Sequence, residues 1–237
     1  MIGGLLLLAG GGLLAALFKD ESQHLRNSKE YGPTMWRNTA VDKLLPDALT
    51  PKRDSMSATT DRSRAQWHRL GISEQTGCDD ALSGSAAEEA KELGCKGALR
   101  ATYVDPTGNT VVTVALVALP KGTDPEAMHG FFSDHSDEHP LEDMVRAYPV
   151  PGSLAADWSD ARRNGSAGDT ADDTDLPYAL IASAGAVDGR KAGHLPGKFG
   201  RTRSDARTDR RAWDGAAQSL LRPLSMHLSD LLLEETS

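Results

Sequence analysis

The apolar segment at residues 2–18 constrains this chain most, because it carries no charged, hydroxyl or amide side chain. A backbone buried in hydrocarbon must satisfy its own hydrogen bonds, which favours a helix. At about 1.5 Å per residue such a helix reaches roughly 25 Å, the short end of what spans a bilayer. We therefore predict a transmembrane helix within residues 1–18, ending before Lys19.

The orientation of this segment rests on two opposed signals. Its start lacks the basic residues of a signal peptide and no cleavage pattern follows, so we predict a retained anchor. Lys19 and Arg26 lie on its C-terminal side, which by the positive-inside rule would place the domain in the cytoplasm. The cysteine pair argues for the outer side of the membrane. Because the apolar segment begins at residue 2, we expect that the natural chain has a basic stretch before it, which would agree with this orientation. The prediction is a single-pass plasma-membrane protein with its domain outside the cytoplasm.

Cys78 and Cys95 are the only cysteines. An even number of cysteines behind a membrane segment favours a disulfide, because such bonds persist in oxidising compartments. A disulfide between them would close a loop of about 18 residues and would stabilise the domain by about 3 kcal/mol. Neither cysteine has a second one at two-residue spacing, so the pair alone does not indicate a zinc site.

The remaining chain divides by composition into a spacer and one domain. Residues 19–65 are polar and interrupted by Pro33, Pro46 and Pro51, which predicts a juxtamembrane linker without a fold. Residues 66–237 are long enough to bury a core. The net charge of −8, with basic residues interleaved among acids, argues against a nucleic-acid partner.

A hairpin is the strongest structural signal within the domain. Runs at 99–104 and 110–119 are rich in β-branched and apolar residues, and they flank a turn of Asp, Pro, Gly and Asn. Further strands are expected over 145–150 and 178–187, with 151–177 mostly loop. We expect helices over 86–93, from 124 through 132, and from 213 to 232, the last kinked or split by Pro223.

This order predicts an α+β fold: a mainly antiparallel four-stranded sheet with helices packed on it, preceded by one N-terminal transmembrane helix. Trp67, Trp158 and Trp213 are expected to anchor the core. Trp36 lies in the linker, where it would either touch lipid headgroups or fold back on the domain.

His135, Glu138 and His139 match the spacing of an inverted zinc-protease motif, in which two histidines bind the metal and the glutamate acts as base. Pro140 follows directly, however, and the surrounding residues are typical of a solvated helix end. They are weak candidates for a metal site. We expect no catalytic residue and no cofactor, and the sequence identifies no binding residue.

The strings that carry a family resemblance are Gln66–Ile72, Cys78 with Gly94-Cys95, Leu99–Tyr103, Ala155–Trp158, Ala184–Gly189 and Leu228–Glu234. They resemble a family of uncharacterised single-pass membrane proteins of actinobacteria. The resemblance implies an anchored extracytoplasmic domain with a paired cysteine bridge, and it implies no activity, ligand or catalytic residue.

These observations predict a membrane-anchored cell-envelope protein whose domain is a non-catalytic binding or interaction module. Its partners would be the lipid bilayer, through residues 2–18, and a protein or envelope component of unknown identity. One alternative is a metal-dependent hydrolase using His135, Glu138 and His139. Another is a cytoplasm-facing accessory subunit of a membrane complex.

Overall fold

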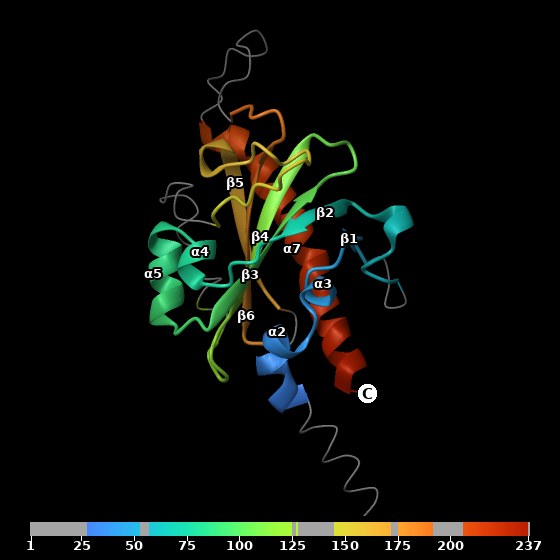
Figure 1. Cartoon of the computed structure of the whole chain (residues 1–237), viewed down its shortest axis with the longest axis vertical. Helices are drawn as coiled ribbons and strands as arrows, with labels where there is room; N and C mark the ends of the chain where they lie inside the picture. The colour runs from blue at the N-terminus through green and yellow to red at the C-terminus, as the bar shows by residue number, and fades with distance from the viewer. Residues whose placement is uncertain are drawn as a thin grey trace, which may run out of the picture.

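A six-stranded sheet forms the centre of the molecule (Figure 1). The computed structural model describes residues 28–52, 57–124, 127, 145–171, 175–191 and 206–236. The strand order is β1-β2-β3-β4-β6-β5, and every neighbouring pair is antiparallel. The strands are β1 (Ala48–Leu49), β2 (Trp67–Ile72), β3 (Gly97–Val104), β4 (Thr110–Ala118), β5 (Arg163–Thr170) and β6 (Tyr178–Ala186). The helices are η1 (Gly32–Thr34), α2 (Met35–Asn38), α3 (Val41–Leu44), η2 (Arg62–Arg64), α4 (Cys78–Ala81), α5 (Gly84–Glu92), η4 (Asp160–Arg162) and α7 (Ala206–Thr236).

The β3–β4 hairpin confirms the prediction made from its two apolar runs. The strands pair from Val104 opposite Val111 to Gly97 opposite Ala118. Asp105 closes the turn, because its Oδ1 accepts hydrogen bonds from the backbone N–H of Thr110 at 2.7 Å and of Asn109 at 2.9 Å. β4 lies between β3 and β6 and is buried on both faces, as its nearly continuous apolar sequence predicts.

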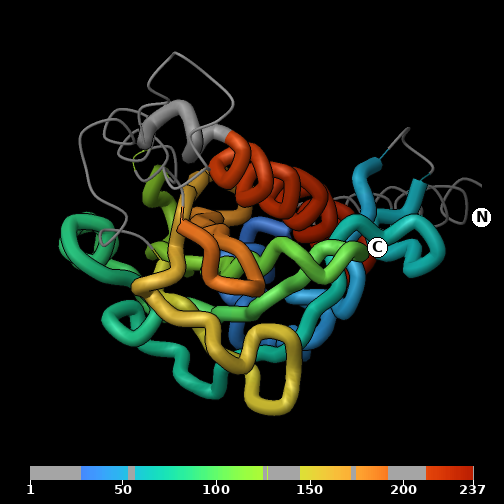
Figure 2. The backbone as a smooth tube through the Cα atoms, turned by 90° about the horizontal axis from the view of Figure 1, so that it is seen from above, coloured from blue at the N-terminus to red at the C-terminus, as the bar shows by residue number. Residues whose placement is uncertain are grey.

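Successive side chains of the central strands point to opposite faces of the sheet, and each face has its own cover. On the first face α7 packs against β5, β6 and β4, and it runs through Pro223 as one helix of 31 residues. Figure 2 shows α7 along one side of the sheet and the chain near residue 150 on the other. The leucines of α7 that are buried on the first face are Leu220, Leu221, Leu224, Leu228, Leu231 and Leu232.

The second face is covered by α4, α5 and the segment around 145–160. Ala86 and Ala90 of α5 lie in one buried cluster with Ala115 of β4 and Ile181 of β6. Small side chains allow the short helices to approach the sheet closely. Trp158 fills the remaining part of this face, where it packs with Val111 and Ala155.

The predicted four-stranded sheet is wrong, because the structure has six strands. Three predicted strands are present, but residues 145–150 form only an isolated bridge between Val145 and Leu82. β1, β2 and β5 were not predicted as strands. β5 has only one β-branched residue, Thr170, and α7 comes very close to it at Gly165, where a Cβ would lie 2.6 Å from the backbone nitrogen of Asp214.

The predicted transmembrane helix is also corrected. Within the described part of the chain, no helix is both long enough and apolar enough to cross a bilayer. Residues 2–18, on which the prediction fell, lie outside the described residues. The fold class is therefore an α+β domain built on a six-stranded antiparallel sheet.

The chain from residue 28 to 52, expected to be a spacer, is packed on the domain. Leu44, Leu45 and Leu49 are fully buried, and β1 adds a strand beside β2. Trp36 folds back on the sheet, since its backbone N–H donates to the Tyr178 hydroxyl at 3.1 Å. Its ring occupies the space where a Cβ on Gly97 would fall, 2.7 Å away.

His227 of α7 joins this N-terminal segment to the helix. Its Nε2 lies 2.7 Å from the Lys43 carbonyl oxygen, and its Nδ1 lies 3.3 Å from the Thr59 hydroxyl. Because a carbonyl oxygen only accepts, Nε2 carries the proton and Nδ1 accepts from Thr59. Burial lowers the pKa of His227, partly opposed by the Lys43 carbonyl and the carboxylates of Asp230 and Glu234.

We expect His227 to make the domain less stable in mild acid. Since its folded pKa lies below the ordinary value of 6.5, the unfolded chain binds more protons as pH falls through that value. The free energy of unfolding should drop from pH 7.5 to pH 5.5, and His227→Gln should reduce that drop. Urea unfolding of both proteins at the two pH values measures the effect. Equal pH dependence in both proteins would contradict it.

Candidate functional site

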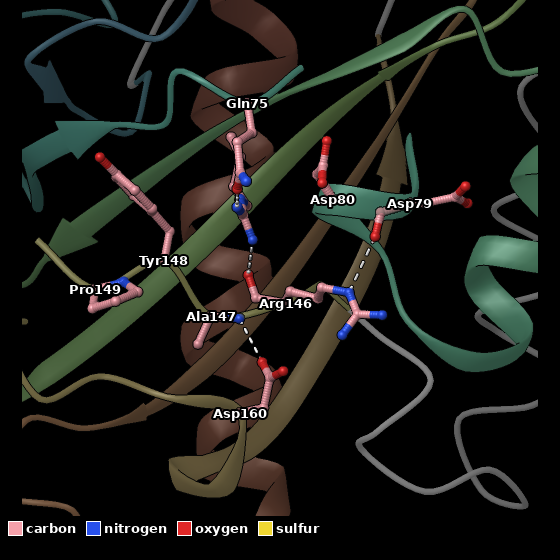
Figure 3. A pocket seen from close by; sticks show the side chains of 9 residues that line it. Gln75, Asp79, Asp80, Arg146, Ala147, Tyr148, Pro149 and Asp160 are labelled. Atoms are coloured by element: carbon pink, nitrogen blue, oxygen red, sulfur yellow. Dashed lines mark hydrogen bonds between the residues drawn. The ribbon is translucent and has the colours of Figure 1, made fainter. Parts of the chain in front are cut away.

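A cavity of about 540 Å³ lies on the second face of the sheet, where α4, residues 146–149 and η4 meet β3 (Figure 3). This volume falls in the range of small-ligand sites. Its lining consists of Gln75, Asp79, Asp80, Arg100, Arg146, Ala147, Tyr148, Pro149 and Asp160.

Side-chain hydrogen bonds, rather than strand pairing, hold residues 146–149 over the sheet. Thr102 Oγ1 of β3 donates to the Tyr148 carbonyl at 2.6 Å, and Arg100 Nη1 donates to the Arg146 carbonyl at 3.1 Å. The Ala147 N–H donates to Asp160 Oδ1 at 2.6 Å. Residues 146–149 form one wall of the cavity, and their backbone is therefore fixed by side chains of β3 and by Asp160.

A buried polar cluster supports this wall from within the sheet. Thr113 Oγ1 of β4 lies 2.8 Å from Thr102 Oγ1 and accepts a hydrogen bond of 2.8 Å from Trp158 Nε1. Trp158 is 3% exposed, which confirms its predicted role as a core anchor. Because every member has a partner, the cluster makes the cavity wall rigid.

The opposite wall is α4, which begins at Cys78. The predicted disulfide is present and joins Cys78 to Cys95, just after α5. Arg146 Nε donates to the carbonyl oxygens of Leu82 at 2.9 Å and Asp79 at 3.2 Å, and so ties α4 to the wall across the cavity. The disulfide thus braces the element that carries Asp79 and Asp80.

Arg100 is the unusual residue of this cavity because only 4% of it is exposed. Its Nη2 donates to Gln75 Oε1 at 3.2 Å, and its guanidinium lies 5.6 Å from the centre of the Tyr148 ring. Its Nε is buried and has no hydrogen-bond partner, and no carboxylate of the described residues forms an ion pair with it. Burial lowers the pKa of Arg100, whereas the more distant Asp160 and Asp80 raise it.

The acidic residues of the lining are exposed, and they differ in their hydrogen bonds and ion pairs. Asp160 Oδ1 is engaged by the Ala147 N–H and lies 3.6 Å from Arg163 Nε. Among the described residues, the Asp80 carboxylate makes no hydrogen bond or ion pair. Figure 3 shows Asp80 and Asp160 on opposite sides of the cavity, with Arg146 between them. The site thus combines a buried positive charge with exposed negative ones.

The residues predicted for a metal site do not belong to this cavity. His135, Glu138 and His139 lie outside the described residues, so that hypothesis stays a prediction. Within the described ranges, no cluster of three or more His, Cys, Asp or Glu side chains is placed to hold a metal ion.

Sequence reasoning did not single out Arg100. The available signal was that Arg100 is the one charged residue of the predicted strand 99–104 and lies between apolar and small residues. This strand also pairs with β4, which is buried on both faces. A charge at such a position must find a partner or a solvent opening.

Comparison with models of protein families, with curated proteins and with solved structures found no match. Membership of the actinobacterial membrane-protein family therefore stays a prediction.

Proposed function

We propose that this chain is a non-catalytic binding module of the cell envelope and that the Arg100 cavity is its ligand site. The observation behind the proposal is a guanidinium that is nearly fully buried, has an unpartnered Nε and borders an open cavity. Burying a charge without a counter-charge is unfavourable. An anionic ligand in the cavity would supply the missing counter-charge to the guanidinium.

The composition of the lining favours binding over group transfer. Among the side chains that act as nucleophiles, it contains aspartate and tyrosine but no serine, cysteine, histidine or lysine. It offers instead a guanidinium for an oxygen, an aromatic ring at Tyr148 and an apolar edge at Pro149. Such a set of a few polar groups beside apolar surface orients a small molecule.

The disulfide supports a location outside the cytoplasm, since disulfides are rare in reducing compartments. This agrees with the predicted extracytoplasmic domain. The bilayer contact of residues 2–18 falls outside the described residues and stays a prediction.

The test is a nuclear magnetic resonance titration of the full chain with acetate, succinate, benzoate and inorganic phosphate. We expect at least one probe to shift the Arg100 Nε–H resonance in a saturable way. Trp67 Nε1 is also buried without a partner, but Trp67 belongs to the core of the other face, so its resonance is the internal control. If none of the probes moves the Arg100 resonance, or if both resonances move together, the proposal is wrong.

A further inference from the structure

We infer that two copies of this chain associate through the outer face of α7, with the two helices antiparallel and Met226 at the two-fold axis. This surface is separate from the Arg100 cavity, because α7 packs on the first face of the sheet and the cavity lies on the second (Figure 2). The inference therefore goes beyond the proposed function and does not depend on it.

A groove of about 570 Å³ runs along the outer face of α7. Its floor is the part of the helix between Gly215 and Met226, and its side is the chain at Pro51, Lys52 and Gln66. Lys52 fixes this side, because its Nζ donates to both carboxylate oxygens of Asp230 at 2.9 Å. The groove thus has a helical floor that is open to solvent and a side that is held to the same helix.

Leu233 is the apolar side chain of α7 that lies outside the core. It is 59% exposed, whereas the other leucines of this helix are buried. It follows Met226 by seven residues, and because seven residues make about two helical turns, both side chains lie on the same outer face. Ser219, in the groove, precedes Met226 by seven residues. Leu233 and the groove therefore lie on one face of the helix, in symmetric positions about Met226.

A second copy of the chain fits this face because the face is complementary to itself. A two-fold axis at Met226 makes the two helices antiparallel and brings Leu233 of each copy level with Ser219 of the other. The short side chain of Ser219 leaves room for a leucine between the helices. One symmetric contact therefore covers both exposed leucines and fills both grooves.

The charges on this face favour the antiparallel arrangement. Arg222 precedes Met226 by four residues and Asp230 follows it by four, so the two-fold axis brings Arg222 of each copy level with Asp230 of the other. The Arg222 guanidinium is exposed and makes no hydrogen bond or ion pair within the described residues. The Asp230 side chain is 40% exposed beside Lys52. A parallel pair would instead bring like charges level with each other.

The association is expected to be weak. One pair of helices buries less than the roughly 1,600 Å² of a standard interface, so we expect a dissociation constant on the order of 10 to 100 μM. The dilute chain is then a monomer and unfolds as one, while the dimer forms in concentrated solution.

Introduced cysteines test this arrangement in the full chain. The two native cysteines are bonded to each other, so each variant has one free thiol per chain. Met226→Cys places two thiols at the two-fold axis, where each adds to one end of a short bismaleimide. At about 100 μM chain we expect at least about tenfold more covalent dimer than with the control Leu154→Cys. Leu154 is 56% exposed and lies outside α7.

Two further variants test the register and the charges. A mixture of Leu233→Cys and Ser219→Cys chains should cross-link, whereas each variant alone should not, because like positions lie about 21 Å apart along the antiparallel pair. Arg222→Glu, added to Met226→Cys, should weaken association about tenfold, since two attractive pairs become repulsive.

Three results would overturn the inference and leave the proposed function standing. The first is an equal yield of dimer from Met226→Cys and Leu154→Cys, which would indicate random collisions. The second is cross-linking of Leu233→Cys with itself but not with Ser219→Cys, which would indicate parallel helices. The third is an unchanged yield in the chain that carries Arg222→Glu. The mixed pair tests the arrangement even if Met226→Cys fails to fold.

Discussion

Replacing Leu228 with alanine is expected to lower the free energy of unfolding by about 3 to 5 kcal/mol. Leu228 lies on α7 and is fully buried in the cluster that joins this helix to the sheet. The substitution removes apolar contacts and leaves a cavity that the surrounding strands cannot close. Urea unfolding followed by circular dichroism measures the effect as a lower midpoint at an unchanged slope.

Leu233 offers a matched control, because it is a leucine on the same helix whose side chain is 59% exposed. Leu233→Ala carries the same change in helix propensity and should alter the free energy of unfolding by less than about 0.5 kcal/mol. Similar losses in the two variants would show that α7 does not pack on the sheet through its Leu228 face.

The elements with strong periodicity could be predicted from the sequence. The hairpin of β3 and β4, the strand β6 and the helix α7 each carry a clear apolar pattern, and each is present. The predicted split at Pro223 is absent, since α7 continues through this residue as one helix, while the leucines on both sides of it lie on one buried face. In these elements the local pattern and the tertiary contacts agree.

The strand β5 could not be predicted because tertiary contacts decide its conformation. Its residues Arg163–Thr170 are mostly small and polar, a composition typical of a loop. The segment becomes a strand because it pairs with β6 and because Gly165 lets α7 come close. Neither the pairing with β6 nor the contact with α7 can be predicted from the residues of β5 alone.

The prediction for residues 145–150 was wrong in the opposite way, because a strand was predicted where none forms. Its apolar and aromatic residues suggested a strand, yet its backbone is held by Thr102, Arg100 and Asp160 side chains instead of a neighbouring strand. These partners lie far away in the sequence, so no local pattern predicts them. The resulting irregular wall creates the candidate site.

The N-terminal part of the domain was missed for a different reason. α2 and α3 are only four residues long, too short to show a period of 3.6 residues. Their burial depends on contacts such as that of Trp36 with Tyr178, between residues more than a hundred positions apart. Prolines and polar residues in such a segment resemble those of a true linker.

Only one part of the candidate site could be predicted from the sequence. The cysteine pair that braces α4 was predicted, whereas Arg100 and Asp80 gave no pattern with a known mechanism. The significance of Arg100 arises from its burial and its unpartnered Nε, which are properties of the folded chain. For this reason the site had to be recognised from geometry and not from motifs.

The double substitution Cys78→Ala with Cys95→Ala is expected to lower the free energy of unfolding by about 3 kcal/mol, since it frees a loop whose ends are 17 residues apart. The loss should also weaken ligand binding at the Arg100 cavity. Cys78 begins α4, and without the bridge this helix is held by the hydrogen bonds of Arg146 and by the burial of Ala81 and Leu82. Urea unfolding and the titration of the Arg100 cavity with small anions measure the two effects separately.

A reducing agent provides the control for this prediction. It should lower the unfolding midpoint of the unmodified chain toward that of the double variant, and it should leave the variant unchanged. A midpoint of the unmodified chain that is insensitive to reductant, with the bond shown to be open, would contradict a stabilising role. Weaker anion binding at the Arg100 cavity after reduction, under conditions where the domain stays folded, would link the redox state of Cys78 and Cys95 to the shape of the site. Such a link would support the proposal that this chain is a binding module of an oxidising compartment.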